Sequence, residues 1–363
     1  MTDVVRRRAL VADLATAGAL TDPAWTDAFL TVPRHAFTPR FRVHRDGAEP
    51  DRLSSADGDA WLAAVYSDMP LITQVDAGST ATSASSQPML MARMLEALDV
   101  ADGHRVLEIG TGTGYNAALL AHRLGSAQVV SLDIDEPIVN AAKKALAEAG
   151  YSPTVVTTDG LAGYPPKAPY DRIIATCSVP TVPAAWVDQL VDGGVLVVNL
   201  GYALARLRKQ GGELAGPFLP GFAAFMGARG GNEEAAFTYR DAMALTGADS
   251  GATRPVHIPG DIDDLNLRAF TRLFLPELVR FTRTSEETVE HGVADPVTRS
   301  WALATEGTVT EAGSRRLWAE LERVYARWRA AGRPDPGRLR LAIDRTGQHI
   351  VHPESGHSRW PIN

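Results

Sequence analysis

The sequence predicts an α/β fold: a doubly wound parallel sheet, helices ahead of it, and an extra C-terminal α+β domain. Two observations predict the sheet. Between about residues 105 and 200 short apolar segments alternate with amphipathic ones, and a glycine-rich turn follows the first apolar segment. Such alternation is typical of parallel strands joined by helices on both faces of a sheet. At roughly 150 residues per domain, the 363 residues are enough for two domains and an additional segment.

The N-terminal region, residues 1–75, is expected to be mainly helical. Apolar residues recur at three-to-four spacing up to about residue 30, and WLAAVYSDMPLITQV (61–75) is typical of a short helix running into an extended segment. The next segment, DAGSTATSASSQP, is rich in Ser, Thr, Gly and Ala and is expected to be a loop. It leads into an amphipathic helix over 89–98, with Gln87 and Pro88 at its entry.

Residues 76–230 are expected to form the core around the parallel sheet. The predicted strands, in chain order, are RVLEIG, VVSLDI, TVVTTD, YDRIIATC and GGVLVVNLG, and the helices between them are YNAALLAHRL, EPIVNAAKKALAEAG and PAAWVDQLV. Gly150 closes the second of these helices. A final antiparallel hairpin is predicted from ALARLRK and FAAFMGAR around Gly211 and Gly212.

Residues 231–363 are expected to form a separate accessory domain. LRAFTRLFLPELVRF predicts a helix broken at Pro276, residues 312–331 predict a Trp- and Arg-rich helix, and the last segment predicts a hairpin turning at Thr346 and Gly347. Aromatic residues lie on one stripe of the 312–331 helix: Trp318, Tyr325 and Trp328. Core packing is favoured for this stripe, with peptide docking as the alternative.

Composition excludes several classes of protein. There are 36 basic and 43 acidic residues, a formal net charge of -7, which counts against a general nucleic-acid binder. No apolar run approaches the length of a membrane span, so no membrane partner is expected. A single cysteine, Cys177, excludes a disulfide framework and a thiolate zinc site, no metal is expected, and the cytosol is the expected compartment.

The densest basic segment of the chain consists of Arg34, His35, Arg40, Arg42, His44 and Arg45. A solvated loop is one interpretation of it, and attraction of an acidic substrate is the other.

The strongest motif is VLEIGTGTGY (106–115), where a predicted strand turns into a helix. Its glycines follow G-x-G-x-G rather than the G-x-G-x-x-G of dinucleotide sites, and Glu108 precedes them. An acidic residue there suits a cofactor with an amino group and a sulfonium charge. Asp133 follows about 20 residues after Gly110, near the spacing of a carboxylate that binds a ribose diol. The pattern predicts an S-adenosylmethionine site in a Rossmann-like class I methyltransferase sheet.

Five segments resemble, in order, those of the protein-L-isoaspartate O-methyltransferase family: AVYSDMPL (64–71), SSQPMLMARML (85–95), VLEIGTGTGYNAALLA (106–121), TTDGLAGYPPKAPYDRIIAT (157–176) and QLVDGGVLVV (189–198). The resemblance covers roughly residues 30–230. It implies a cofactor site for S-adenosylmethionine, which leaves as S-adenosylhomocysteine, formed by Glu108, Gly110, Thr111, Gly112, Gly114, Asp133, Ile134, Asp159, Gly160 and Thr176.

The resemblance also implies the substrate side of the site. Ser86 matches the serine before Gln-Pro that lies between the methyl donor and the substrate carboxylate, and Ser85 is the alternative for this role. Substrate contacts are expected from Tyr66, Asp68, Thr82 and Ser83. A carboxylate is already ionised at neutral pH, so its attack on a sulfonium methyl group needs no general base.

Three departures from the repair enzymes of this family bear on the substrate. Ala84, Ser85 and Ser86 replace the usual Thr-Ile-Ser, Asp133 replaces Glu, and the C-terminal extension of about 130 residues is absent from smaller members. The serine-rich loop, the YNAALL variant (115–120) and the long C-terminal extension together resemble the subfamily found with ribosomally made peptides, beside ATP-grasp ligases or lanthipeptide synthetases. That resemblance implies methylation of an aspartate in a cyclised precursor peptide, followed by closure to aspartimide or rearrangement to isoaspartate. The alternatives are a housekeeping repair enzyme and a non-catalytic module with a vestigial cofactor fold.

Overall fold

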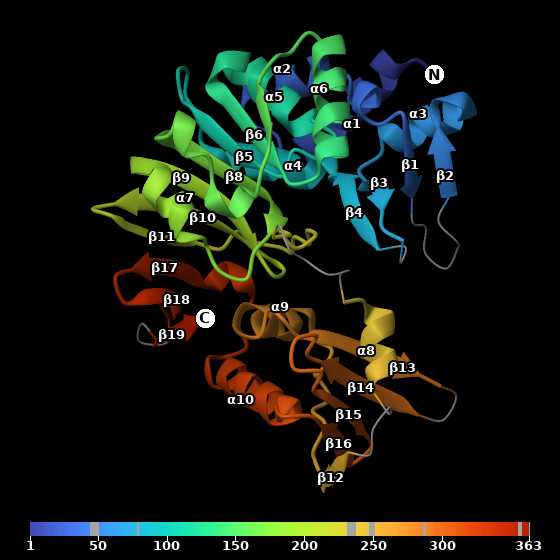
Figure 1. The fold of residues 1–363 in the computed structure, drawn as a ribbon, viewed down its shortest axis with the longest axis vertical. Helices are drawn as coiled ribbons and strands as arrows, with labels where there is room; N and C mark the ends of the chain where they lie inside the picture. The colour runs from blue at the N-terminus through green and yellow to red at the C-terminus, as the bar shows by residue number, and fades with distance from the viewer. Residues whose placement is uncertain are drawn as a thin grey trace. The chain divides into compact units, whose positions relative to one another are not determined.

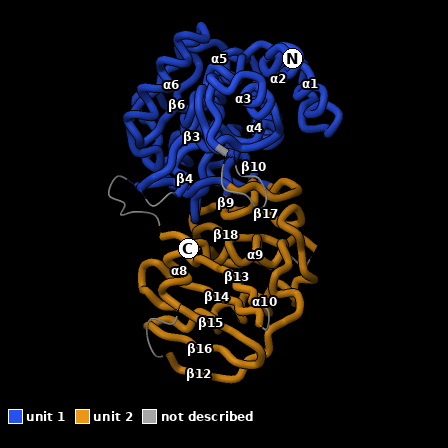
Figure 2. Tube along the Cα trace, turned by 90° about the vertical axis from the view of Figure 1, so that its right-hand side faces the viewer, with its two compact units in different colours: residues 1–199, 205–216, 225–233 blue, residues 200–204, 217–224, 234–363 orange. Residues whose placement is uncertain are grey.

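The computed structural model describes residues 1–43, 51–77, 80–230, 237–246, 251–285, 288–354 and 358–362. The chain divides into two compact units (Figure 2). Unit 1 contains residues 1–199, 205–216 and 225–233, and unit 2 contains residues 200–204, 217–224 and 234–363. The expected N-terminal region and the core therefore share one unit, and short segments before residue 231 belong to unit 2. Among the described residues, no helix combines the length and apolar content needed to cross a membrane.

The helices of unit 1 are α1 (Asp3–Thr16), α2 (Pro23–Thr31), α3 (Asp59–Val65), α4 (Pro88–Leu98), α5 (Tyr115–Leu124), α6 (Glu136–Glu148) and α7 (Ala184–Gln189), with short 3-10 turns that include η1 (Arg34–Phe37) and η4 (Gly160–Ala162). Its strands are β1 (Arg40–Val43), β2 (Asp51–Ser54), β3 (Leu71–Val75), β4 (Ala81–Ser85), β5 (Val106–Ile109), β6 (Val129–Asp133), β7 (Thr154–Thr157), β8 (Tyr170–Ser178), β9 (Leu190–Leu200), β10 (Ala203–Gln210) and β11 (Glu213–Pro217).

The large sheet of unit 1 has the predicted doubly wound arrangement (Figure 1). Its strands follow the order β11-β10-β9-β8-β5-β6-β7. The pairs β5–β6, β5–β8, β6–β7 and β8–β9 are parallel. Every residue of β5 is buried, as expected for a strand covered on both faces. The chain order reverses at β5, and ligands of such sheets bind at the carboxyl ends of the strands beside this point.

A second, four-stranded sheet has the order β2-β1-β3-β4. Here the prediction of a loop over DAGSTATSASSQP was wrong, because Ala81–Ser85 pairs antiparallel with β3. A strand built from Ala, Ser and Thr has no apolar alternation that the sequence could reveal. Its hydrogen bonds to β3 and the burial of Ser83 and Ser85 stabilise it instead.

Two further differences concern the ends of unit 1. The helical spacing up to residue 30 belongs to two helices, because Gly18 takes a positive φ of 69° and Asp22 caps α2, its Oδ1 accepting the Ala24 N–H at 2.8 Å. The hairpin turning at Gly211 and Gly212 is present, but its second strand is β11 rather than the predicted FAAFMGAR.

Unit 2 contains the helices α8 (Tyr239–Leu245), α9 (Leu265–Phe274) and α10 (Leu317–Ala330), and the strands β12 (Ala252–Pro255), β13 (Val279–Thr284), β14 (Val289–Ala294), β15 (Trp301–Thr305), β16 (Thr308–Ala312), β17 (Arg340–Asp344), β18 (Gly347–His352) and β19 (Ser358–Ile362). Strands β12 to β16 form a five-stranded sheet that the sequence analysis did not predict. The predicted hairpin is present as β17 and β18. Trp318 and Trp328 are buried, so they pack in the core as favoured.

Candidate active site

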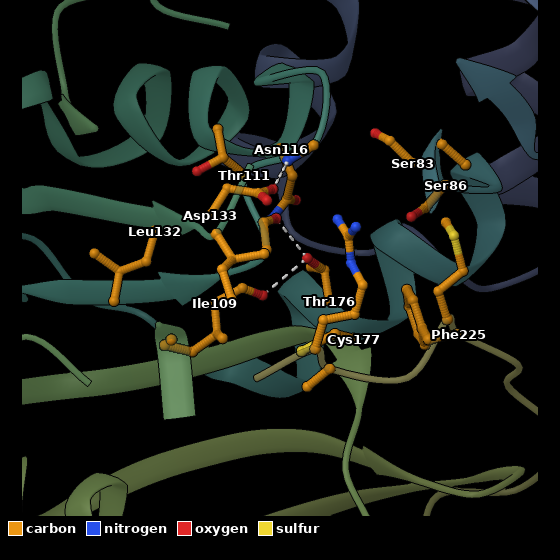
Figure 3. A pocket seen from close by; sticks show the side chains of 18 of the residues that line it. Ser83, Ser86, Ile109, Thr111, Asn116, Leu132, Asp133, Thr176, Cys177 and Phe225 are labelled. Carbon is orange, nitrogen blue, oxygen red and sulfur yellow. Dashed lines mark hydrogen bonds between the residues drawn. The ribbon is translucent and has the colours of Figure 1, made fainter. Parts of the chain in front are cut away.

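A pocket opens at the carboxyl ends of β5, β6 and β8, with β4 and residues 225–229 as further walls (Figure 3). The predicted site residues that line it are Thr82, Ser83, Ser85, Ser86, Gly110, Thr111, Gly112, Asp133, Ile134, Asp159, Gly160 and Thr176. In Figure 3 the side chains of Ser83 and Ser86 lie on the opposite side from Asp133 and Leu132. The strand order thus gathers segments that are far apart in the sequence around one cavity.

The turn after β5 requires glycine at two positions of the pocket wall, 110 and 112. Gly110 and Gly112 have positive φ angles of 96° and 52°. A Cβ at Gly110 would lie 2.7 Å from the Thr176 hydroxyl, which itself donates to the Gly110 carbonyl at 2.7 Å. Gly114 does not line the pocket: a Cβ there would meet Ala142 of α6, so this glycine allows helix packing. The predicted cofactor contact of Gly114 stays a prediction.

Asp133, at the end of β6, presents a carboxylate to the pocket. Its Oδ2 accepts the Gly112 N–H at 2.9 Å and its Oδ1 accepts the Asp135 N–H at 3.3 Å. These bonds fix the carboxylate and leave lone pairs for a diol. The carboxylate of Asp159 is held in the same way: it caps the start of η4, where its Oδ1 accepts the Leu161 N–H at 2.9 Å.

We expect Asp133→Ala to weaken binding of S-adenosylmethionine by roughly 1.5–3 kcal/mol, since it removes charge-assisted hydrogen bonds to the ligand. Calorimetric titration measures this change. The control is Glu136→Ala, which removes the same charge from an exposed residue outside the pocket lining and should bind normally. Equal affinity of the Asp133 variant and the wild type would contradict the assignment.

Glu108 lies behind the pocket wall, fully buried, rather than in it. Its Oε1 accepts from Asn116 Nδ2 at 2.6 Å, and its Oε2 accepts from Ser131 Oγ at 2.5 Å. Ser131 Oγ also lies 2.6 Å from Thr111 Oγ1, which lines the pocket. Glu108 thus holds Asn116 directly and Thr111 through Ser131. Its predicted direct contact with the cofactor stays a prediction.

Asn116 is a pocket residue that the sequence analysis missed. Its Oδ1 is buried and has no hydrogen-bond partner within the described residues. Because Asn116 Nδ2 is committed to Glu108, this amide presents an acceptor that a ligand must satisfy. An amino group suits it.

Burial raises the pKa of Glu108 to about 7, against hydrogen bonds from Ser131 and Asn116 that lower it. A folded-state pKa above the unfolded value of about 4.5 means that the contribution of Glu108 to stability is full below pH 4.5 and is lost as pH rises through 7. We expect the free energy of unfolding of cofactor-free wild type, relative to Glu108→Gln, to fall by up to about 3 kcal/mol over that range. Urea titrations at several pH values measure it; a difference that does not change with pH would contradict the expectation.

A buried arginine holds Ser85, the last residue of β4, and Ser86, which follows it. Arg34, in η1, is fully buried, and its Nε donates to Ser85 Oγ at 3.3 Å. Its terminal nitrogens donate to the carbonyls of Val65, Ser67, Met69, Ser85 and Ser86. Burial lowers the pKa of this guanidinium to about 10, so it stays charged at neutral pH. The Ser86 hydroxyl, which lines the pocket, makes no hydrogen bond within the described part of the chain.

Two predicted substrate residues do not reach the pocket lining. Tyr66 is buried, its hydroxyl lies 2.8 Å from His35 Nδ1, and burial raises its pKa to about 12. Asp68 accepts from Gln87 Nε2 and from the Met89 N–H, both at 2.8 Å, and so holds the entry of α4. Both residues order the segment 65–69 and the entry of α4, and their substrate contacts stay predictions.

Residues 225–229 form a wall that the sequence analysis missed. Met226 accepts the Ser178 N–H at 2.9 Å and Ala228 donates to the Ser178 carbonyl at 2.8 Å, which places this segment beside the end of β8. Arg229 lines the pocket and lies 4.0 Å from Asp135. Cys177 also lines it, but burial raises the pKa of its thiol to about 12, so the thiolate is not available at neutral pH.

Three parts of an S-adenosylmethionine molecule have a suitable partner in this pocket. The unpartnered Asn116 Oδ1 suits its ammonium group, Asp133 suits the ribose diol, and the apolar side chains of Ile109, Leu132, Ile134 and Leu161 beside Asp159 suit an adenine. The glycine turn leaves the space that a Cβ would fill.

Comparisons with known proteins agree with this fit. Residues 51–216 match the family described as protein-L-isoaspartate(D-aspartate) O-methyltransferase (PCMT). The protein-L-isoaspartate O-methyltransferase of Methanosarcina mazei is 39% identical over 198 residues, 53% of this chain and 71% of that one. The enzyme of the same name from Methylorubrum populi is 36% identical over 217 residues, 59% of this chain and 89% of that one. A solved protein-L-isoaspartate O-methyltransferase superposes with a TM-score of 0.56 and 26% identity, covering 95% of this chain and 98% of that one.

Proposed function

The chain belongs to the protein-L-isoaspartate O-methyltransferase family of S-adenosylmethionine-dependent carboxyl O-methyltransferases, and we propose that it methylates the free carboxylate of an L-isoaspartyl residue in a peptide or protein. The observation that carries the proposal is the position of Ser86: its uncommitted hydroxyl lines the same pocket as Asp133 and Asn116.

The chain's own residues would align the reaction rather than supply a base. S-adenosylmethionine, when bound, supplies an electrophilic methyl group. The Ser86 hydroxyl would donate to one oxygen of the substrate carboxylate and leave the other free to attack. Arg34 holds the Ser85 and Ser86 carbonyls, so the hydroxyl is presented from a fixed backbone. Thr176 fixes the glycine turn from the opposite wall, where its hydroxyl donates to the Ile109 and Gly110 carbonyls.

A second candidate substrate is an aspartate in a cyclised, ribosomally made precursor peptide. The presence of unit 2 does not distinguish the two candidate substrates. A solved protein named only as a protein-L-isoaspartate O-methyltransferase also matches 95% of this chain. What favours this candidate is a cavity lined by Arg40, Arg42 and Arg52. Fixed charges suit an acidic peptide: a defined precursor can carry acids beside every methylated residue, whereas damaged proteins carry them beside only some of theirs.

The test compares three substrates with the full-length protein and S-adenosylmethionine: an isoaspartyl peptide, its aspartyl twin, and a ring-bearing peptide with a normal aspartate. We expect methyl ester on the isoaspartyl peptide and none on the linear twin, measured by mass spectrometry. Methylation of the ring-bearing peptide alone, followed by loss of methanol and a net loss of one water, would favour the second candidate. Ester formation on none of them would contradict both.

A further inference from the structure

One face of the four-stranded sheet carries arginines outside the pocket described above. Arg40 and Arg42 are two residues apart on β1, so both point to the same side of the sheet. The antiparallel register puts Arg52 of β2 directly opposite Arg42. These three arginines line a cavity together with Ile72 and Gln74 of β3. We refer to Arg40, Arg42 and Arg52 as the arginine face.

The three arginines of the arginine face are not paired with acids among the described residues. Within the described part of the chain none of its three side chains makes a hydrogen bond or an ion pair. Elsewhere in unit 1 arginines do pair with acids: Arg6 with Asp59, Arg123 with Asp102, and Arg206 with Asp99. Like charges directly opposite one another destabilise a sheet. Since the whole chain carries a net charge of -7, general basic composition does not explain the cluster. An anion in the cavity would relieve the repulsion.

The arginine face leads to the candidate active site along a single row of paired residues. Arg52 is opposite Arg42, Arg42 is opposite Ile72, and Ile72 is opposite Ala84. Ala84 lines the active-site pocket. Two residues further along β3, past a shift in the register with β4, Gln74 accepts from the hydroxyl of Thr82, another pocket residue, at 2.7 Å. Paired residues of one sheet therefore connect the arginine face to the pocket.

We propose that the arginine face binds acidic side chains of the peptide substrate that flank the methylated residue. The inference rests on the proposed function, because it assumes that the pocket accepts a peptide carboxylate. Two strand spacings separate Arg42 from Ala84, about 10 Å, which an extended peptide spans in about three residues. The recognised substrate class is therefore a peptide with carboxylates about three positions from its methyl acceptor.

The test uses two isoaspartyl peptides that differ only in having Glu or Gln three positions to either side of the isoaspartate. For the wild type at low ionic strength we expect a KM about fivefold to tenfold lower for the Glu peptide, the scale of two or three partly exposed ion pairs. The difference should shrink as salt is added. The double variant Arg42→Gln, Arg52→Gln should lose it, with the KM for the Glu peptide rising to that for the Gln peptide.

The matched control is Arg8→Gln, which removes an exposed arginine of α1 and should keep the preference. No preference in the wild type, or an equal preference in the double variant, would overturn the proposal. If neither peptide is methylated, the proposed function fails, and anisotropy of labelled Glu and Gln peptides then tests the arginine face alone. Tighter binding of the Glu peptide that the double variant abolishes would still support it; equal binding would overturn it.

Discussion

Ser86→Ala is expected to lower the rate of methyl transfer to bound isoaspartyl peptide on the order of 100-fold. The pocket offers this hydroxyl, uncommitted within the described residues, on the wall opposite Asp133. Small errors in the alignment of reacting groups cost about this much. Because the cofactor-side wall is untouched, affinity for S-adenosylhomocysteine should change by no more than about threefold. Single-turnover rates and calorimetry measure the two effects separately.

Ser85→Ala is the matched comparison for this experiment. Ser85 also lines the pocket, but its hydroxyl accepts from Arg34 Nε. We expect its loss to reduce stability more than rate. Wild-type turnover in Ser86→Ala, together with a large loss in Ser85→Ala, would transfer the positioning role to Ser85.

The sequence predicts the cofactor side of the site better than the substrate side, for a physical reason. Parallel strands buried on both faces are continuous apolar runs, so β5 to β9 could be predicted from hydropathy alone. The glycine turn and the acids after each strand then fall at one edge of the sheet. Glu108 and Gly114 lie outside the pocket lining, and sequence spacing does not reveal this because the neighbours that enclose them come from β6 and α6.

The substrate side depends on pairings that leave little trace in composition. The strand Ala81–Ser85 has no hydrophobic signal, and residues 225–229 are held by backbone bonds to Ser178, which any sequence could make. The residues of the basic segment 34–45 differ in burial although they are alike in charge. Arg34 is fully buried, Arg40 is exposed, and His44 and Arg45 lie outside the described residues. A solvated loop therefore does not describe Arg34, and attraction of an acidic substrate is proposed only for Arg40 and Arg42 of this segment.

Arg34 is expected to be the side chain on which the substrate side depends most for stability. Its guanidinium connects η1 to the segment 65–69 and to the end of β4 through six hydrogen bonds. Five of them end on backbone carbonyls, which lose this donor when the side chain is replaced. A planar fork with five N–H groups serves this geometry, and a lysine ammonium with three cannot.

We therefore expect Arg34→Met to reduce the free energy of unfolding by about 3–5 kcal/mol, the scale of removing one partner from a buried polar cluster. Arg34→Lys should retain more stability than Arg34→Met but less than the wild type. Urea titration measures both, with Arg8→Met, a substitution of an exposed arginine, as the control that should stay within about 0.5 kcal/mol of wild type. Where Arg34→Met still folds, hydrogen exchange should rise at residues 65–69 and 85–86 but not in β5, because only the former depend on the guanidinium. A loss below about 1 kcal/mol with unchanged exchange would mean that the segment holds Ser86 in place without Arg34.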